Sequence, residues 1–364
     1  MPGKVVLFGA TGYTGELTAR ELVKRGAKPL LAGRNERLLT ALADELGGLE
    51  TAVADVSSPA SIAQLLNPGD ALVTTVGPFV KLGQPALDAA LAKGAHYVDS
   101  TGEPAWIRNV FEHDARAKAA GIAALTSFGY DYVPGNLAAG LALDRATEPV
   151  HSVDVGYFVQ GGFGASGGTM ASLAGALLEP GFEFSAGQLK SARGAKSDRT
   201  FETTVGPRTG LSIGASEHFA IPRLNSEVEN VGAYLGWFGG NTAPIKAGSA
   251  ALNGLIKVPG VKRAIGLGLS KLLPGSTGGP TENERAKTKS LAVAETSASD
   301  GRTLAHVEVN GPNAYDLTAS FLAWAGIKLA ADGPSETGAL GPVEVFGLDE
   351  LVAGCASAGL IATN

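Results

Sequence analysis

Short apolar runs alternate with amphipathic helical patterns over the first third of the chain. The apolar runs occupy residues 5–8, 29–32, 51–54, 71–76, 96–98 and 122–125. Helical patterns separate most of them, for example at 14–25, 36–46 and 84–92. This alternation is typical of βαβ units, and strands that are apolar throughout belong to a parallel sheet covered on both faces. The pattern predicts an α/β domain built on a parallel sheet.

The pattern changes after residue 129. A longer strand is predicted at 150–159, antiparallel strands at 201–205, 217–221 and 304–309, and a helix at 315–331. Between them lie a glycine-rich loop with a following helix, 161–178, and a broken helical segment, 243–273. We therefore expect a second, α+β domain inserted before the C-terminal helices. The predicted boundaries are 1–132 for the first domain, completed by 337–364, and 133–336 for the second.

A glycine-rich turn follows the first predicted strand and opens the first predicted helix. It reads Gly9-Ala10-Thr11-Gly12-Tyr13-Thr14-Gly15. Gly9 permits a tight turn, Gly12 lets the backbone approach a pyrophosphate, and Gly15 permits close packing of the helix on the strand. The helix N-terminus adds free N–H groups and the positive end of its dipole. These seven residues are expected to bind a dinucleotide in a Rossmann-type domain; the alternative is a turn without a ligand.

The end of the second predicted strand favours NADP(H) over NAD(H). An NAD site places Asp or Glu there to hold the ribose 2′-hydroxyl, whereas this chain has Arg34 and Asn35. The guanidinium of Arg34 suits a 2′-phosphate because it forms bidentate hydrogen bonds, and Arg37 would add a second charge. The alternative for Arg34 is a solvated residue at a helix start. Asp55 follows the third strand and is expected near the adenine.

The turns after the fourth and fifth strands face the same edge of the predicted sheet. Val76, Gly77 and Pro78 are expected to line the dinucleotide, since ligands bind outside the carboxyl ends of parallel strands; the alternative is a plain βα turn. Asp99 and Glu103 are candidates for the substrate end of the site. The alternative for Glu103 is a capping box with Ser100 at the start of a helix.

The turn after the sixth strand supplies the candidates for proton transfer. Tyr130, Asp131 and Tyr132 lie at the predicted domain junction, where pockets tend to form. The alternative is a hinge whose polar side chains cap the next helix. Farther along, Ser166, Gly167 and Thr169 are candidate substrate contacts, because their loop ends at a helix start; a close-packed turn is the competing interpretation.

Composition narrows the classes of partner. The net charge of −6 argues against nucleic acid, whose phosphates need a basic face. The single cysteine excludes an intrachain disulfide and fits a reducing, cytoplasmic compartment. No leader pattern precedes the first strand, no apolar run is long enough for a membrane span, and the five histidines lack metal-ligand spacing. Residues 257–273 carry basic side chains among apolar ones, so they form either a lipid-facing lip or a helix packed on its own domain.

Several motifs, taken together, resemble the saccharopine dehydrogenase-like oxidoreductases, and within them the trans-acting enoyl reductase type. The resemblance is dense up to residue 145 and looser beyond it. It departs where many relatives read Gly-Phe-Asp-Ser-Ile-Pro, because Tyr130 replaces Phe and Tyr132-Val133 replaces Ser-Ile. The motifs are Gly9–Gly15, Gly33-Arg34-Asn35, Gly77-Pro78-Phe79, Gly83-Gln84-Pro85, Tyr97-Val98-Asp99 with Gly102-Glu103, and Gly129-Tyr130-Asp131 with Pro134.

The resemblance implies NADP(H), hydride transfer, and a Rossmann domain interrupted by an α/β domain. It implies a substrate with either a C=C bond of a lipid or polyketide intermediate or a C=N bond of an amino-acid adduct. We expect an NADPH-dependent reductase of the enoyl bond of an apolar small molecule, working as a homodimer. A C=N reductase or saccharopine-type C–N oxidoreductase is the alternative. No tyrosine begins a Tyr-x-x-x-Lys pair, which keeps open a third class, an NADPH-binding sensor or scaffold without catalysis.

Overall fold

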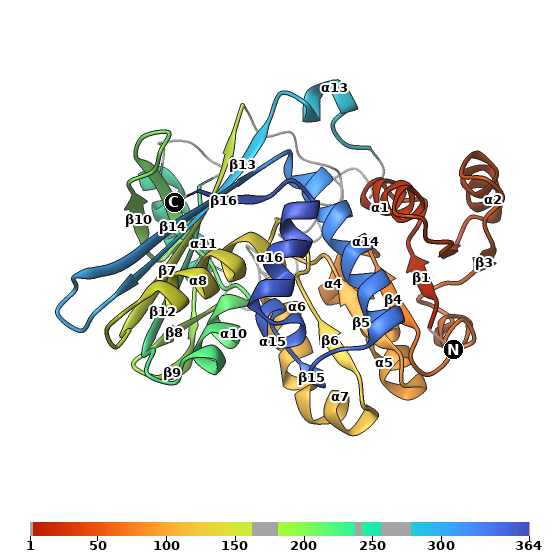
Figure 1. Cartoon of the computed structure of the whole chain (residues 1–364), viewed down its shortest axis with the longest axis horizontal. Coiled ribbons are helices and arrows are strands. Elements are labelled where there is room, and N and C mark those ends of the chain that lie inside the picture. Colours follow the sequence, from red (N-terminus) through yellow and green to blue (C-terminus); the bar gives the residue numbers. More distant parts are fainter. Residues whose placement is uncertain (1–2, 162–180, 237–241, 256–277, 364) are drawn as a thin grey trace.

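The computed structural model describes residues 3–161, 181–236, 242–255 and 278–363. Two sheets organise the described chain, one on each side of Figure 1. Helices α15 and α16 contact each other and α8, and α16 also contacts α14. One continuous apolar core extends from the first sheet into the second. The fold class predicted from the sequence, a Rossmann-type parallel sheet with a second α+β domain, is confirmed.

The first sheet is parallel, in the order β15-β6-β5-β4-β1-β2-β3. The order reverses between β1 and β4, and the loops after these strands lie at one edge of the sheet. In such a sheet the ligand binds outside the carboxyl ends of the strands at this reversal. The strands are β1 Val5–Phe8, β2 Leu30–Gly33, β3 Thr51–Val53, β4 Ala71–Thr74, β5 His96–Asp99, β6 Ala123–Leu125 and β15 Gly338–Ala339.

Helices cover the first sheet and connect it to the second. Helix α14 packs along α1 and over β4 and β5, while α5 contacts α3 and α7. The predicted helix at 315–331 is confirmed as α14, which Asn313 caps by accepting from the Tyr315 amide at 2.8 Å. The helices of this part are α1 Tyr13–Lys24, α2 Glu36–Glu45, α3 Pro59–Ala63, α4 Phe79–Leu82, α5 Gln84–Lys93, α6 Pro104–Glu112, α7 Asp114–Ala120, α14 Ala314–Asp332, α15 Pro342–Phe346 and α16 Leu348–Ser357.

The second sheet is mixed, with α8 packed on β7, β13 and β14. Its main path runs β10-β11-β12-β7-β13-β14-β16, and β8 joins β12 and β9 at one side. The strands are β7 Ser152–Gln160, β8 Gly181–Ser185, β9 Gln188–Ala192, β10 Asp198–Phe201, β11 Arg208–Ser212, β12 Asn230–Leu235, β13 Lys289–Ser297, β14 Thr303–Gly311 and β16 Ile361–Thr363. The helices are α8 Val133–Arg145, α10 Glu217–Leu224, α11 Thr242–Leu255 and α13 Glu282–Arg285.

Two of the predicted strands are wrong. Residues 217–221 form the start of helix α10, whose buried residues Glu217, Ala220 and Ile221 recur at helical spacing. A five-residue window is too short to separate a period of 2 from one of 3.6. The strand predicted at 201–205 ends at Phe201, because Thr203 accepts from Val205 and donates to Gly206 in a turn.

The predicted domain boundaries at 132/133 and 336/337 stay a prediction. The C-terminal residues contribute to both sheets, since β15 extends the first while β16 pairs with β14. In the described part of the chain, no helix is both long and apolar enough to cross a bilayer.

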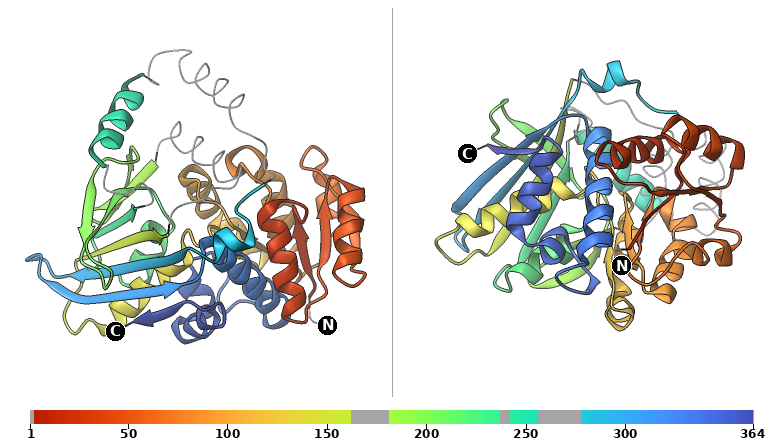
Figure 2. Two further views of the ribbon diagram at one scale, coloured as in Figure 1. Left: turned by 90° about the horizontal axis from the view of Figure 1, so that it is seen from above. Right: turned by 45° about the vertical axis from the view of Figure 1, so that its right-hand side comes forward.

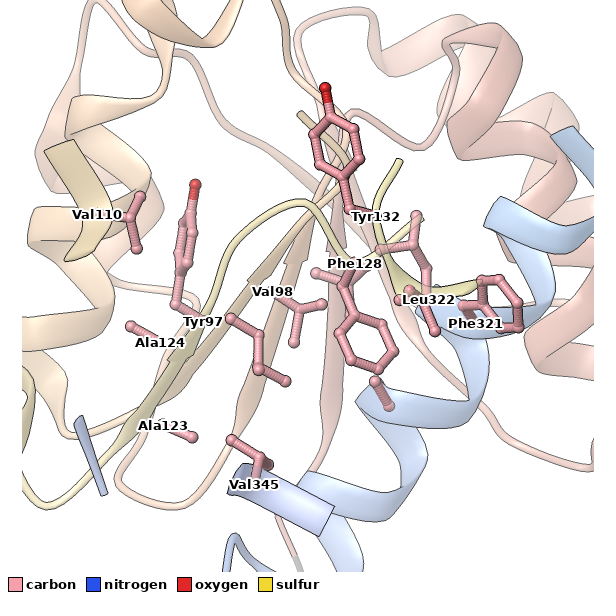
Figure 3. Packing of buried hydrophobic residues seen from close by; sticks show 14 of the residues in the cluster. Tyr97, Val98, Val110, Ala123, Ala124, Phe128, Tyr132, Phe321, Leu322 and Val345 are labelled. Carbon is pink, nitrogen blue, oxygen red and sulfur yellow. The ribbon is translucent and has the colours of Figure 1, made fainter. Parts of the chain in front are cut away.

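Apolar side chains fill the space beneath the junction of the two halves. Figure 3 shows Phe128, from the loop after β6, among Val98, Phe321 and Leu322. Tyr132 points its hydroxyl away from these side chains. The loop after β6 is thus anchored on one side and presents polar groups on the other.

Candidate functional site

The glycine-rich turn has the geometry of a dinucleotide loop. Gly9 adopts a left-handed conformation with φ +92°. A methyl group at Gly15 would collide with the carbonyl oxygen of Gly9, so only glycine lets α1 approach β1 this closely. A methyl group at Gly12 would touch only that oxygen, at 3.4 Å. No side chain caps the N-terminus of α1 at Gly12. This open helix end fits a bound pyrophosphate.

Two alanine substitutions in this turn should separate folding from binding. Gly15→Ala should destabilise the chain by about 1–3 kcal/mol or more, because its new methyl overlaps backbone. Gly12→Ala should leave thermal unfolding unchanged but weaken NADPH binding at least about tenfold, because the methyl occupies the path of the pyrophosphate. Calorimetric binding and unfolding scans measure both. Normal NADPH affinity in Gly12→Ala would contradict this position of the pyrophosphate.

Arg34 and Asp55 lie together beside this turn. Arg34 directly follows β2, its side chain is 76% exposed, and its Nε lies 3.8 Å from Asp55 Oδ2. Hydrogen bonds from Ser57 lower the pKa of Asp55. Asn35 caps α2 by accepting from the Leu38 amide at 3.1 Å. The guanidinium of Arg34 is therefore held loosely and can turn toward a phosphate.

A segment of the second half of the chain lies against the start of α1. The Tyr13 hydroxyl donates to the Pro280 carbonyl at 2.5 Å. Arg285 donates to the same hydroxyl at 3.2 Å and to Asp316 at 2.7 Å. Figure 2 shows this cyan segment running to the red α1. The two halves of the chain thus meet beside the dinucleotide turn. No sequence pattern predicts this contact, because 267 residues separate Tyr13 from Pro280.

Glu103 holds the turn after β4 in place. Its carboxylate accepts from the Phe79 and Val80 amides at 2.8 and 3.1 Å, at the start of α4. This fixes the preceding turn, Val76-Gly77-Pro78, at the carboxyl edge of the sheet. The capping box with Ser100 is not formed, because α6 begins at Pro104 with Glu103 itself as the N-cap residue. A role of Glu103 in substrate binding stays a prediction.

Asp99, at the end of β5, is a buried centre of hydrogen bonds. Its carboxylate accepts from the Tyr97 hydroxyl at 2.8 Å, the Trp106 indole at 2.7 Å, the Thr101 and Ser127 amides, and the Thr126 hydroxyl. Burial raises the pKa of Asp99, and these donors oppose the rise. The network joins the loops after β5 and β6, so Asp99 acts as a structural support for the residues that follow.

The three candidates for proton transfer differ in their surroundings. Tyr130 donates from its hydroxyl to the Phe158 carbonyl at 2.8 Å. Asp131 Oδ1 and the Tyr132 hydroxyl are buried and have no hydrogen-bond partner among the described residues. Burial and the nearby charge of Glu217 raise the pKa of Asp131 to about 8. Asp131 is therefore protonated at neutral pH, which suits a proton donor.

Glu217 and Tyr157 form a polar cluster beside the loop that carries Asp131. The Tyr157 hydroxyl contacts Glu217 Oε1 within hydrogen-bond reach and lies 3.1 Å from the Tyr132 carbonyl. Burial raises the pKa of Glu217 to about 7. The residue pattern points to neither: Glu217 opens a run that reads as a strand, and Tyr157 lies within another predicted strand. The one signal for Glu217 is an ionisable side chain in a predicted strand.

The raised pKa values predict that stability falls as the pH rises. Asp131 and Glu217 have higher pKa values in the folded than in the unfolded chain, so their contribution is complete below about pH 4 and is lost as pH rises through about 7 and 8. Between pH 6 and 9 the midpoint of thermal unfolding should fall by about 2 °C or more. Asp131→Asn should flatten this slope; an unchanged slope in the variant would contradict the assignment.

Some predicted positions lie outside the described residues. These are Ser166, Gly167 and Thr169, with the basic and apolar segment 257–273. Within the described ranges, no group of three or more His, Cys, Asp or Glu side chains is placed to hold a metal ion.

The strand order and the glycine turn define a dinucleotide-binding protein of the Rossmann class. Comparisons with known proteins show what this chain is similar to. Residues 5–125 match the family model of the saccharopine dehydrogenase NADP binding domain. This match agrees with the resemblance that the motifs carry, and the prediction of NADP(H) as the cofactor is confirmed.

Curated relatives match less than half of the chain. A trans-acting enoyl reductase of Mycobacterium ulcerans is 35% identical over 152 residues, which is 40% of this chain and 36% of the relative. One from Mycobacterium leprae is 35% identical over 140 residues, 36% of this chain and 34% of the relative. The matched part thus spans little more than a third of the length of these relatives.

One solved structure matches the whole chain in fold. Apo saccharopine dehydrogenase (L-Glu forming) from Saccharomyces cerevisiae aligns over 99% of both chains with a TM-score of 0.59. At 14% sequence identity, this likeness shows a shared fold and nothing about the substrate.

Proposed function

We propose that this protein is an NADPH-dependent reductase that adds hydrogen across the C=C bond of an enoyl substrate. The observation that carries the proposal is the buried acid Asp131 in the loop after β6, at the same edge of the sheet as the dinucleotide turn. The relatives named trans-acting enoyl reductase favour a C=C bond over a C=N bond.

The order of the strands orients the proposed reaction. Along the edge, the loops follow the order β2, β1, β4, β5 and β6. Arg34 after β2 would hold the 2′-phosphate, and the Gly9–Gly15 turn the pyrophosphate. The reacting end of the cofactor would then lie toward the loops after β4, β5 and β6, where Asp131 is found. We propose Asp131 as the proton donor.

The proposed roles account for the two electrons and the two hydrogen atoms that the C=C bond gains. NADPH supplies a hydride, which carries both electrons, to the β-carbon of the enoyl group. Asp131 supplies the proton to the α-carbon and takes a new proton from water. The turn Val76-Gly77-Pro78, fixed by Glu103, would form the wall beside the reacting bond.

Reduction of a C=N bond is the second candidate. The likeness to saccharopine dehydrogenase is one of fold alone, so it favours this reaction less strongly. The full chain should oxidise NADPH in the presence of a 2-enoyl thioester and leave preformed imines of amino acids unchanged. Turnover with imines alone would establish the second candidate. Tight NADPH binding without turnover of either substrate would establish the third class, a sensor or scaffold.

The apolar character of the substrate and a homodimer remain predictions. Enoyl thioesters of increasing chain length should show rising kcat/KM if the site is apolar. Light scattering of the purified chain measures its oligomeric state.

A further inference from the structure

Glu217 stands out among the buried groups that the proposed reaction leaves without a role. It begins α10 and is fully buried, although a glutamate is rarely buried without a partner. Its carboxyl accepts hydrogen bonds from Tyr157 and Ser216, and Tyr157 also bonds to the Tyr132 carbonyl in the loop after β6. The charge of Glu217 acts on Asp131 and Tyr132 of that loop. A buried carboxyl costs stability, so its presence here points to a role in the chemistry of that loop.

Tyr157 is placed to bond Glu217 in either protonation state. The tyrosine has one proton and two neighbours, Glu217 Oε1 and the Tyr132 carbonyl. When Glu217 is ionised, Tyr157 donates to it; when Glu217 is protonated, it donates to Tyr157, which then donates to the carbonyl. Asn136 Nδ2 also donates to that carbonyl, at 2.8 Å, so the carbonyl keeps a partner in both states. This arrangement accommodates a proton that comes and goes.

Asp131 has the opposite surroundings. Its Oδ1 is buried without a hydrogen-bond partner among the described residues, and its Oδ2 lies near Gly102 in the loop after β5. An ionised carboxylate there would be poorly stabilised, whereas Glu217 has donors for its ionised form from Tyr157 and Ser216. Of the two acids, Glu217 loses its proton first.

We propose that Asp131 and Glu217 form one coupled acid pair, in which ionised Glu217, held by Tyr157, is the positioning residue that keeps the proton on Asp131. The inference rests on the proposed function for its catalytic meaning. Like charges placed close together raise the pKa of the second group to ionise. After Asp131 gives up its proton, two neighbouring carboxylates would repel each other, and this repulsion favours reprotonation before the next turnover.

The other ionisable groups around the pair stay neutral or are bound elsewhere. Burial raises the pKa of the Tyr132 and Tyr157 hydroxyls, so both remain protonated. His218 follows Glu217 along α10, but its ring packs on Phe182 and burial lowers its pKa to about 4. Glu344, on α15, forms an ion pair with Arg223 of α10. These two charges therefore neutralise each other and not Asp131 or Glu217.

Infrared titration of the full chain without cofactor or substrate tests the pair directly. The C=O stretch of protonated carboxyls should disappear in two steps between about pH 6 and 9. Glu217→Gln should remove one step and move the other, from Asp131, to lower pH by about one unit or more, because the neighbouring charge is gone. Asp131→Asn should leave the Glu217 step near its original pH, because Asp131 is still uncharged when Glu217 ionises. An Asp131 step at unchanged pH in Glu217→Gln would overturn the proposal.

Two further variants serve as controls for the infrared titration. Glu344→Gln removes a partly buried carboxyl whose partners are Gly341 and Arg223, so it should leave both steps in place. If Glu217→Gln does not fold, Tyr157→Phe keeps both carboxyls and should move the Glu217 step to higher pH, since the ionised form loses a donor. An unmoved step in Tyr157→Phe would overturn the link through Tyr157.

The rate of reduction separates this inference from the proposed function. In Glu217→Gln the pH midpoint of kcat should fall by about one unit, whereas a structural role would lower kcat equally at every pH. Coupled titration without turnover of any substrate would support the acid pair and contradict the proposed reductase activity. Turnover with independent titration steps would support the reductase activity and contradict the acid pair.

Discussion

Replacing Asp131 with asparagine is expected to lower kcat for NADPH-dependent reduction by about 10²–10⁴-fold, the range for loss of a general acid. Asparagine has nearly the same shape and cannot donate an acidic proton, so the dissociation constant of NADPH should not change. Stopped-flow measurement of NADPH oxidation with an enoyl thioester gives the rate, and calorimetry gives the affinity. Equal kcat in the variant would remove Asp131 from the reaction.

The two neighbouring tyrosines provide the competing outcomes. Tyr132→Phe deletes a hydroxyl that has no hydrogen-bond partner among the described residues, so neither folding nor kcat should change if Asp131 is the acid. Tyr130→Phe removes a donor to the Phe158 carbonyl and should cost stability without a specific loss of kcat. A large loss of kcat in Tyr132→Phe with full activity in Asp131→Asn would make Tyr132 the proton donor instead.

Replacing Arg34 with alanine should weaken NADPH binding by about 1.5–3 kcal/mol, which is about 10- to 150-fold in the dissociation constant. The guanidinium is exposed and only loosely held by Asp55, so its loss should not disturb the fold. NADH, which lacks the 2′-phosphate, should bind the variant and the unchanged chain equally. Calorimetric titration with both cofactors measures the difference.

An exposed arginine elsewhere serves as the matched control. Arg116 is 56% exposed on α7 and pairs with Asp88, as Arg34 pairs with Asp55. Arg116→Ala should change the affinity for neither cofactor. Equal losses for NADPH and NADH in Arg34→Ala would show that the arginine acts through the local fold and not through the phosphate.

The first domain could be predicted closely from the sequence because its signals are local. Each strand is a short apolar run, each helix has its own periodic pattern, and the glycines of the turn lie within seven residues of one another. The structure agrees at Gly9, whose φ of +92° only glycine adopts readily, and at Gly15, where a methyl would strike the Gly9 carbonyl. Steric requirements of this kind involve only neighbouring residues, so they can be predicted from the sequence.

The second half of the chain was predicted less well, because its sequence patterns are weak and its strands pair with partners far along the chain. No sequence pattern predicts strand β13, which is central in the second sheet. At Glu217 the pattern predicts a strand, whereas the structure has a helix. Strands in a mixed sheet gain their stability from partners far along the chain, such as β7 for β13, so their own residues specify them less clearly.

The order of residues is enough to predict the dinucleotide turn, the arginine that favours NADP(H), and the loop that carries Asp131. Folding alone decided the environment of that acid, because Glu217 and Tyr157 come from α10 and β7, far along the chain from it. It likewise decided that Glu103 fixes the start of α4 and that Tyr13 meets Pro280. A carboxyl's chemistry depends on burial and on neighbouring charges, and both arise from contacts between segments distant in sequence.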